Sequence, residues 1–275
     1  MRATKLLNLI HMKVGGIIHK MRTSLGNPVS YTLGFGDEYI ELNPLIGKEI
    51  NLSFGGDIFC ISCGKKTKKS FAQGFCYPCF MSAPEAAECI IRPELCRAHE
   101  GEGRDIEWEK ANHLQEHFVY LAVSSGLKVG VTRSTQIPTR WIDQGASRAI
   151  LLAQVPNRYL AGCIEVALKE HVSDRTHWQK MLKNEVADVD LEEEKSRMED
   201  LLPRDLQDYI ADSDEITEIQ YPVEDYPLKI KSIGFDKESK ISGTLKGIKG
   251  QYLYLDFDRV LNIRKHTGYV ITLEC

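Results

Sequence analysis

The sequence has no long apolar run and no internal repeat. Its 275 residues contain no stretch of the roughly eighteen apolar residues that a membrane-spanning helix needs, so we do not expect an integral membrane protein. The apolar patch at residues 6–10 is shorter than the apolar region of a secretory signal peptide. We therefore expect a globular, cytoplasmic protein without a membrane partner, and no small-molecule cofactor is apparent.

The net charge of −4 conceals an uneven distribution. Residues 184–225 hold 16 acidic and 3 basic residues, a local charge of −13, so the other 233 residues carry 32 basic and 23 acidic residues, or +9. The acidic stretch, which contains LEEEKSRMEDLL, is typical of a solvated connecting helix. The mildly basic remainder permits binding to nucleic acid without establishing it.

Four cysteines form two C-x-x-C units, with the spacing C-x2-C-x12-C-x2-C, at Cys60, Cys63, Cys76 and Cys79. Each unit can place two thiolates on one ion, and a hairpin between the units would bring the pairs together. Four sulfurs at tetrahedral corners are the ligand set of a structural zinc ion and leave no open position for catalysis. Without a secretory signal, the spacing predicts zinc rather than disulfides.

The segment between the two cysteine pairs is rich in lysine. It carries Lys65, Lys66, Lys68 and Lys69 and no acidic residue. A zinc-stabilised hairpin with four lysines would suit contact with phosphates. A solvated loop is an equally good interpretation, and the sequence does not choose between them.

A looser set of metal-binding residue types follows in residues 83–117. Cys89, Cys96 and His99, together with His113 or His117, could supply a second zinc site of two cysteines and two histidines, although the spacing is irregular. The alternative is a packed loop with incidental histidines.

The pattern of strands and helices predicts an α+β fold in six segments. These are an N-terminal β segment (12–57), a four-cysteine zinc knuckle (58–82), a second Cys/His segment (83–117), an α/β core (118–183), an acidic helical connector (184–215) and a small β-barrel of the OB or SH3 kind (216–275). On the barrel, Arg264 and Lys265 lie near Tyr252, Tyr254 and Tyr269 in an arrangement that could bind single strands, although ordinary barrel surface is commoner.

The core begins with the string VYLAVSSGLKVGVTR, which resembles the opening of a GIY-YIG nuclease domain. Val119-Tyr120 matches the first motif, and Lys128-Val129-Gly130 matches the second with lysine in place of tyrosine. The expected order of strand, strand, helix, strand, helix also agrees. The resemblance implies that Tyr120 helps to activate water, that Arg140 holds the scissile phosphate, with Arg133 as its competitor, and that Glu165 binds Mg²⁺ or Mn²⁺. Glu165 lies away from the apolar stripe of its helix and is therefore expected to face a cleft.

Several longer strings resemble an uncharacterised family of bacterial and archaeal proteins, a domain of unknown function. The strings are CGKKTKKSFAQGFCYPCF, RPELC, KVGVTR, RWIDQGA and NIRKHTGY. The resemblance implies an architecture and no activity. Members of that family carry additional cysteines at the positions of Gly103 and His113, so the resemblance implies that the second metal site is weakened in this chain or that imidazole replaces a thiolate.

Two classes of function follow from these observations, and a third is weaker. The first is a zinc-containing, nucleic-acid-associated protein that acts as a divalent-metal-dependent nuclease through Tyr120, Arg140 and Glu165. The second is a non-catalytic protein that binds DNA or RNA through a degenerate nuclease core, which Lys128 favours. The third is a zinc-stabilised interaction scaffold.

Overall fold

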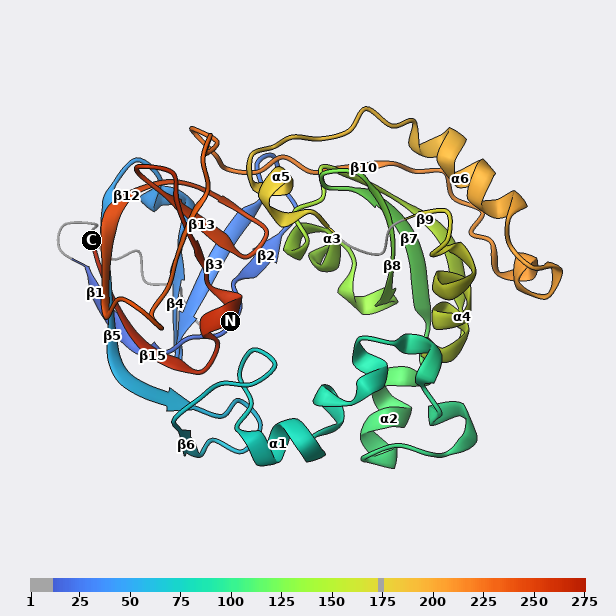
Figure 1. Cartoon of the computed structure of the whole chain (residues 1–275), viewed down its shortest axis with the longest axis horizontal. Helices are drawn as coiled ribbons and strands as arrows, with labels where there is room; N and C mark the ends of the chain where they lie inside the picture. The colour runs from blue at the N-terminus through green and yellow to red at the C-terminus, as the bar shows by residue number, and fades with distance from the viewer. Residues whose placement is uncertain (1–11, 173–175) are drawn as a thin grey trace, which may run out of the picture. The chain divides into compact units, whose positions relative to one another are not determined.

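The computed structural model describes residues 12–172 and 176–275, and these form a mixed α+β protein with three sheets (Figure 1). The chain divides into two compact units, of which the first contains residues 12–23, 30–77 and 221–275 and the second residues 24–29 and 78–220. Among the described residues, no helix is long and apolar enough to cross a membrane.

The first unit is built on an eight-stranded sheet. In sheet order its strands are β1 (Lys13–Ile17), β15 (Tyr269–Glu274), β5 (Glu49–Phe59), β12 (Lys240–Lys249), β13 (Tyr252–Leu255), β14 (Arg259–Asn262) and β11 (Lys231–Ile233), with β6 (Lys66–Thr67) paired to β5. A smaller sheet has the order β2 (Arg22–Ser24), β3 (Ser30–Phe35), β4 (Glu38–Glu41). Strands from both ends of the chain therefore share one sheet.

The predicted closed barrel over residues 216–275 is not found. The described part of the sheet is open, with β1 and β11 at its two edges. The physical reason is the position of β5, which comes from the N-terminal segment and lies between β15 and β12. Because the C-terminal strands pair with N-terminal ones through β5, they do not close on themselves.

Lys249, the last residue of β12, is fully buried in this unit. Its Nζ lies 5.2 Å from the ring centroid of Tyr221 and 5.5 Å from that of Tyr226. Burial lowers the pKa of Lys249 from 10.5 to about 8, because the apolar surroundings disfavour the ammonium form.

We expect Lys249→Met to change how stability depends on pH. Between pH 8 and 10.5 the unfolded wild type binds more protons than the native state, so its free energy of unfolding should rise with pH relative to the variant. The rise is at most about 3 kcal/mol, at about 1.4 kcal/mol per pKa unit. Urea titrations at pH 7.5 and 10 would measure it, with Lys240→Met at the exposed start of β12 as the control. A pH-independent difference between wild type and Lys249→Met would contradict the assignment.

The second unit contains a four-stranded antiparallel sheet in the order β10 (Thr217–Glu218), β9 (Arg148–Val155), β7 (His117–Val123), β8 (Leu127–Arg133). The α-helices from α2 onward are α2 (Ile106–His113), α3 (Thr139–Asp143), α4 (Arg158–Leu168), α5 (Trp178–Leu182) and α6 (Leu191–Asp200). The order β7, β8, α3, β9, α4 confirms the predicted order of strands and helices.

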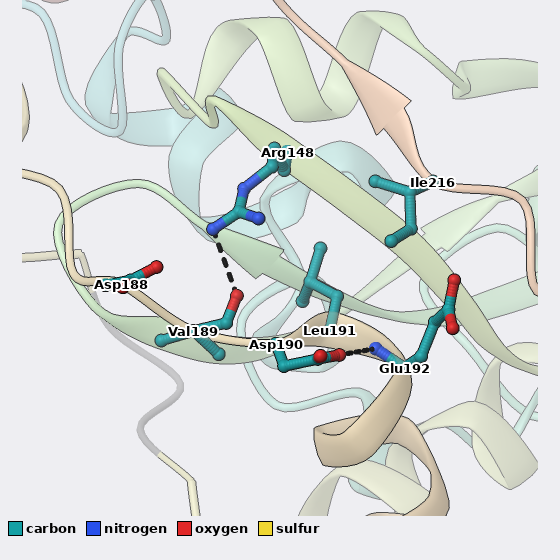
Figure 2. A pocket seen from close by; sticks show the side chains of 7 residues that line it. All are labelled: Arg148, Asp188, Val189, Asp190, Leu191, Glu192 and Ile216. Atoms are coloured by element: carbon teal, nitrogen blue, oxygen red, sulfur yellow. Dashed lines mark hydrogen bonds between the residues drawn. The ribbon is translucent and has the colours of Figure 1, made fainter.

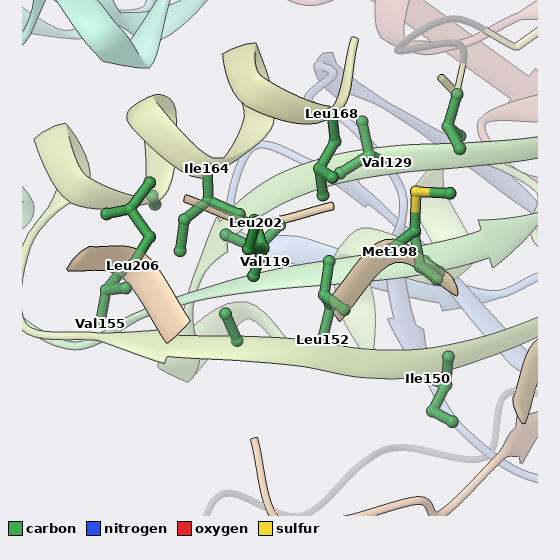
Figure 3. Close-up of a cluster of buried hydrophobic side chains, with 14 of the residues drawn as sticks. Val119, Val129, Ile150, Leu152, Val155, Ile164, Leu168, Met198, Leu202 and Leu206 are labelled. Carbon is green, nitrogen blue, oxygen red and sulfur yellow. The ribbon is translucent and has the colours of Figure 1, made fainter. Parts of the chain in front are cut away.

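Helix α4 begins and packs as its sequence predicts. The side chain of Asn157 accepts a hydrogen bond from the amide of Leu160 at 2.9 Å and so caps the helix. Ala161, Ile164 and Leu168 recur with helical spacing and are fully buried against the sheet. Figure 3 shows the resulting core, in which Val119, Val129 and Leu152 of the strands meet the side chains of α4.

The acidic connector is not the solvated helix that its composition predicts. Leu191 and Met198 of α6 are buried and join the core shown in Figure 3, followed by Leu202 and Leu206 beyond the helix. Glu192 and Glu193 of the same helix are exposed. The high charge of this stretch gave no sign of its few apolar residues, which pack into the core.

Candidate metal centre and phosphate site

The four cysteines of the paired C-x-x-C units meet in the structure. Cys60 follows β5 directly, and Cys79 lies on the short helix α1 (Tyr77–Ser82). The four Sγ atoms all lie within 4.8 Å of one another, and Cys63 Sγ is 3.8 Å from Cys76 Sγ. A zinc tetrahedron with Zn–S bonds of about 2.3 Å has S–S edges of about 3.8 Å. The cluster therefore fits a zinc ion held by four thiolates.

Backbone amides near this site stabilise the thiolate form of Cys60, which is the form that binds a metal cation. Burial raises the pKa of the Cys60 thiol, but amide hydrogen bonds from Cys76, Cys63 and Ser62 more than offset it, so the pKa falls to about 6. Gly64 adopts a positive φ of 69°, which lets the turn close after Cys63. Amides that stabilise thiolate sulfur are typical of structural zinc sites.

The four lysines between the cysteine pairs are all exposed. Lys66 forms an ion pair with Asp57 at 2.5 Å, so part of its charge is compensated. Lys69 Nζ lies 5.3 Å from the ring centroid of Phe71. Lys65, Lys68 and Lys69 therefore remain the better candidates for contact with phosphate.

A second cluster brings together Cys89, Cys96, Glu109 and His113, whose ligand atoms all lie within 4.8 Å of one another. Cys89, Cys96 and His113 were predicted from the sequence as ligands, and Glu109 was not. The spacing of Glu109 and His113, four residues apart on α2, was the available signal.

Neither of the other two histidines belongs to this cluster. His99 stacks on Tyr159, with ring centroids 4.4 Å apart. His117 is fully buried; its Nδ1 lies 2.7 Å from the carbonyl of Gln115, and burial lowers its pKa to about 4. The cluster formed by the described residues therefore uses a glutamate where the sequence predicted His99.

Tyr120, Lys128 and Gly130 share one face of the β7–β8 pair, since Tyr120 lies opposite Gly130 and Ala122 opposite Lys128. A Cβ at position 130 would lie 2.6 Å from the Tyr120 hydroxyl oxygen, so the tyrosine ring lies over the glycine. Without that glycine the ring could not adopt this position.

Helix α3 and its end supply the partners of these side chains. The Tyr120 hydroxyl donates to Gln144 Oε1 at 2.8 Å, and Lys128 Nζ donates to the same oxygen. Trp141 contacts the Tyr120 ring edge-on at a centroid distance of 6.0 Å. Gly145, with a φ of 69°, ends the helix as predicted.

Arg140 and Glu165 also act on Tyr120. Burial raises the pKa of Tyr120, while the charge of Arg140 and a hydrogen bond with it lower that pKa and the charge of Glu165 raises it. Burial lowers the pKa of Arg158. The negative charge of Glu165 raises that pKa, and the positive charge of Arg140 lowers it. Tyr120 therefore lies within interaction range of Arg140 and of Glu165, the two residues that the sequence placed in one site with it.

The burial of this group differs from the expectation of an open cleft. Glu165 is only 9% exposed, Lys128 3% and Tyr120 0%. Glu165 was expected to face a cleft because it lies off the apolar stripe of α4. Arg140, by contrast, stays partly exposed.

Arg133 does not compete with Arg140 at Tyr120. It pairs in register with His117, and its guanidinium donates to Asn112 Oδ1 at the end of α2. Three positions separate His117 from Tyr120 on β7, so their side chains project from opposite faces of the strand.

The basic-aromatic surface predicted near the C-terminus is not assembled as expected. Tyr254 and Tyr269 are 1% and 6% exposed, so they are core residues and not stacking platforms. Lys265 forms an ion pair with Asp236 at 2.6 Å, and Arg264 is partly exposed. Of the three tyrosines, only Tyr252 is partly exposed, so two of the three expected aromatic rings are unavailable beside Arg264 and Lys265.

A separate pocket lies beside the acidic connector and contains none of the predicted site residues (Figure 2). Arg148 donates to the carbonyl of Val189 at 3.0 Å, and Asp190 caps α6 through the amides of Glu192 and Glu193. These contacts explain the polar walls as helix capping and chain anchoring.

Comparison with known proteins supports the family and nothing more specific. No curated protein and no solved structure matches the chain. A family model described as "Protein of unknown function (DUF2797)" matches residues 47–271, which include both cysteine clusters and the Tyr120 site. The chain therefore belongs to the DUF2797 family.

Proposed function

We propose that the chain is a zinc-containing, nucleic-acid-associated protein, and that Tyr120, Arg140 and Glu165 form a GIY-YIG-like site for divalent-metal-dependent phosphodiester hydrolysis. The observation that carries the proposal is the packing of Tyr120 against α3, the helix that carries Arg140, through Trp141 and the hydrogen bond to Gln144. The order β7, β8, α3, β9, α4 adds support, because it is the order that the motif resemblance implies.

The residues suit distinct parts of that reaction. Arg140, partly exposed at α3, would hold the phosphate and stabilise the charge that develops on its oxygens. Tyr120, whose hydroxyl is held by Gln144, would help to position the attacking water. Glu165 would hold Mg²⁺ or Mn²⁺, which supplies further positive charge; one carboxylate suffices when the ion keeps several waters.

A non-catalytic DNA- or RNA-binding protein is the second candidate, and specific observations favour it. Lys128 replaces the second motif tyrosine and shares Gln144 Oε1 with Tyr120. Arg140 acts on Tyr120, and Arg158 interacts with Glu165. With two arginines and one glutamate, the site is cationic before any metal binds. Such a site binds phosphate more readily than it binds a metal cation.

Nucleic-acid association is tested by the salt dependence of binding. We expect Lys65→Ala/Lys68→Ala/Lys69→Ala to weaken binding to DNA or RNA and to flatten the plot of log affinity against log salt. Each lost phosphate contact lowers the slope by about 0.9 for duplex and about 0.7 for single strands. Fluorescence anisotropy between 50 and 300 mM salt, roughly, would measure the change.

The triple variant Lys229→Ala/Lys237→Ala/Lys240→Ala is the matched control. It removes three exposed lysines of the same unit that are remote in sequence from the cysteine loop. Equal slopes for the two triple variants would show that the loop makes no specific phosphate contact. Absence of binding at low salt to duplex and single strands would overturn the association itself and leave the scaffold interpretation.

A further inference from the structure

We propose that Cys89, Cys96, Glu109 and His113 bind a second zinc ion, which fixes residues 83–117 to helix α4 and thereby positions Arg158. The proposal does not depend on catalysis at Tyr120. It assigns a mixed thiolate, carboxylate and imidazole site to residues that lie apart from the four-cysteine cluster.

The distance between Cys96 and His113 matches a shared metal. Cys96 Sγ lies 3.5 Å from His113 Nδ1. In a zinc tetrahedron, bonds of about 2.3 Å to sulfur and about 2.0–2.1 Å to nitrogen give an S–N edge of about 3.5 Å. Glu109 Oε2 contacts the same ring nitrogen, and all four ligand atoms lie within 4.8 Å of one another.

A catalytic Cys–His–Glu relay would look different. In such a relay the nucleophile and the carboxylate contact opposite nitrogens of the imidazole ring. Here both groups contact Nδ1, and Cys96 is only 2% exposed. Two acceptor groups directed at one nitrogen indicate ligands around a common centre.

The charges also require a cation. With both thiols ionised, Cys89, Cys96 and Glu109 would place three negative charges in a buried site, which is costly unless they are compensated. One zinc ion leaves a net charge of −1. The Arg158 guanidinium, which donates to the backbone carbonyls of Cys89 and Ile90 beside the cluster, offsets the remainder.

A bound metal ion would stabilise residues 83–117, whose apolar core is small. They form the short 3-10 turns η2 (Pro84–Ala86), η3 (Glu88–Ile90), η4 (Pro93–Leu95) and η5 (Ala98–Glu100) before α2. The core of this segment consists of Ala87, Ala98 and the two cysteines, with Tyr159 packed against it. These side chains are small, so their burial contributes only part of what holds the segment in place.

The cluster is tied directly to the first turns of α4. Arg158 donates to the carbonyls of Cys89 and Ile90, both at 2.8 Å. A Cβ at Gly162 would lie 2.1 Å from the amide nitrogen of Glu94, so the η4 turn packs against the helix backbone. A metal bound to Cys89 would therefore also fix the carbonyls of Cys89 and Ile90, and through them the side chain of Arg158.

Glu109 occupies the space that a side chain at position 103 would need. A Cβ built on Gly103 would lie 2.4 Å from Glu109 Cγ. The glycine therefore admits the carboxylate, and any larger residue at position 103 would displace it. Glu109 is only 2% exposed, as expected for a ligand and not for a surface glutamate.

Elemental analysis of the whole chain, purified without chelator, tests the proposal. We expect two zinc ions per chain in the wild type and one in Cys96→Ser, while Cys163→Ser retains two. Glu109→Gln should keep the fold but release one zinc ion to a chelator at least tenfold faster. Cys60→Ser/Cys63→Ser should retain the second ion, and cobalt loaded into that variant should show tetrahedral d–d bands with thiolate charge transfer.

One zinc ion per wild-type chain, removed by Cys60→Ser/Cys63→Ser and not by Cys96→Ser, would overturn the proposal. This outcome is decisive even when Cys96→Ser does not fold, because it rests on the wild type and on the double variant. Hydrogen exchange supplies the structural readout. Loss of the second ion should raise exchange in residues 83–117 and in the first turn of α4, and unchanged exchange there would contradict the positioning role.

Discussion

Glu165→Gln is expected to abolish phosphodiester cleavage, lowering its rate by roughly 1,000-fold or more. Gln keeps the shape of the side chain but removes the charge that would hold Mg²⁺ or Mn²⁺, and metal charge stabilisation is worth several kcal/mol at about 1.4 kcal/mol per factor of ten. Affinity for the nucleic acid should change little. Single-turnover cleavage and anisotropy on the same preparations would separate the two effects.

Glu170→Gln is the matched control, because Glu170 is exposed just beyond α4 and interacts with none of the site residues described above. Glu165 is buried, so circular dichroism and zinc content must show that Glu165→Gln folds normally. Cleavage by Glu165→Gln at the wild-type rate would remove Glu165 from the chemistry and support the non-catalytic candidate.

Cys76→Ser is expected to cost the protein one zinc ion and the local order of residues 60–79. Metal binding by structural zinc sites contributes about 10–16 kcal/mol in zinc-finger peptides, far more than the short strand β6 and helix α1 can replace. Elemental analysis should show the loss of one equivalent. Hydrogen exchange should rise in residues 60–82, while β7 and β9 keep their protection because they belong to the other compact unit.

Cys275→Ser controls for the loss of a thiol outside both cysteine clusters. Retention of full zinc content and of exchange protection by Cys76→Ser would contradict a four-cysteine metal centre. Such a result would leave the four cysteines as a reduced cluster whose sulfur distances match a zinc tetrahedron without serving one.

The features that sequence predicted well are local. The C-x-x-C spacing located Cys60, Cys63, Cys76 and Cys79 because each pair is fixed by one turn. Asn157 and the apolar stripe of α4 follow from helix capping and helix periodicity, which act within about eight residues. The strand order around Tyr120 follows from short connections between neighbouring elements.

The features that sequence missed depend on contacts between distant segments. Strand β5 pairs with β15 and β12, which lie some two hundred residues later, and no local pattern shows such pairing. The same sheet buries Tyr254 and Tyr269, which had been expected to be exposed. Glu109 escaped notice because glutamates are usually surface residues, and only its i,i+4 relation to His113 distinguished it.

The central claim is most directly tested by cleavage measured with the zinc-loaded wild type. The protein would be incubated with duplex, single-stranded and branched DNA and RNA while Mn²⁺ or Mg²⁺ is titrated. The account predicts cleavage that depends on the added divalent ion, because four thiolates close the structural zinc site to catalysis. Binding without any cleavage across this panel, unchanged by added metal, would contradict it.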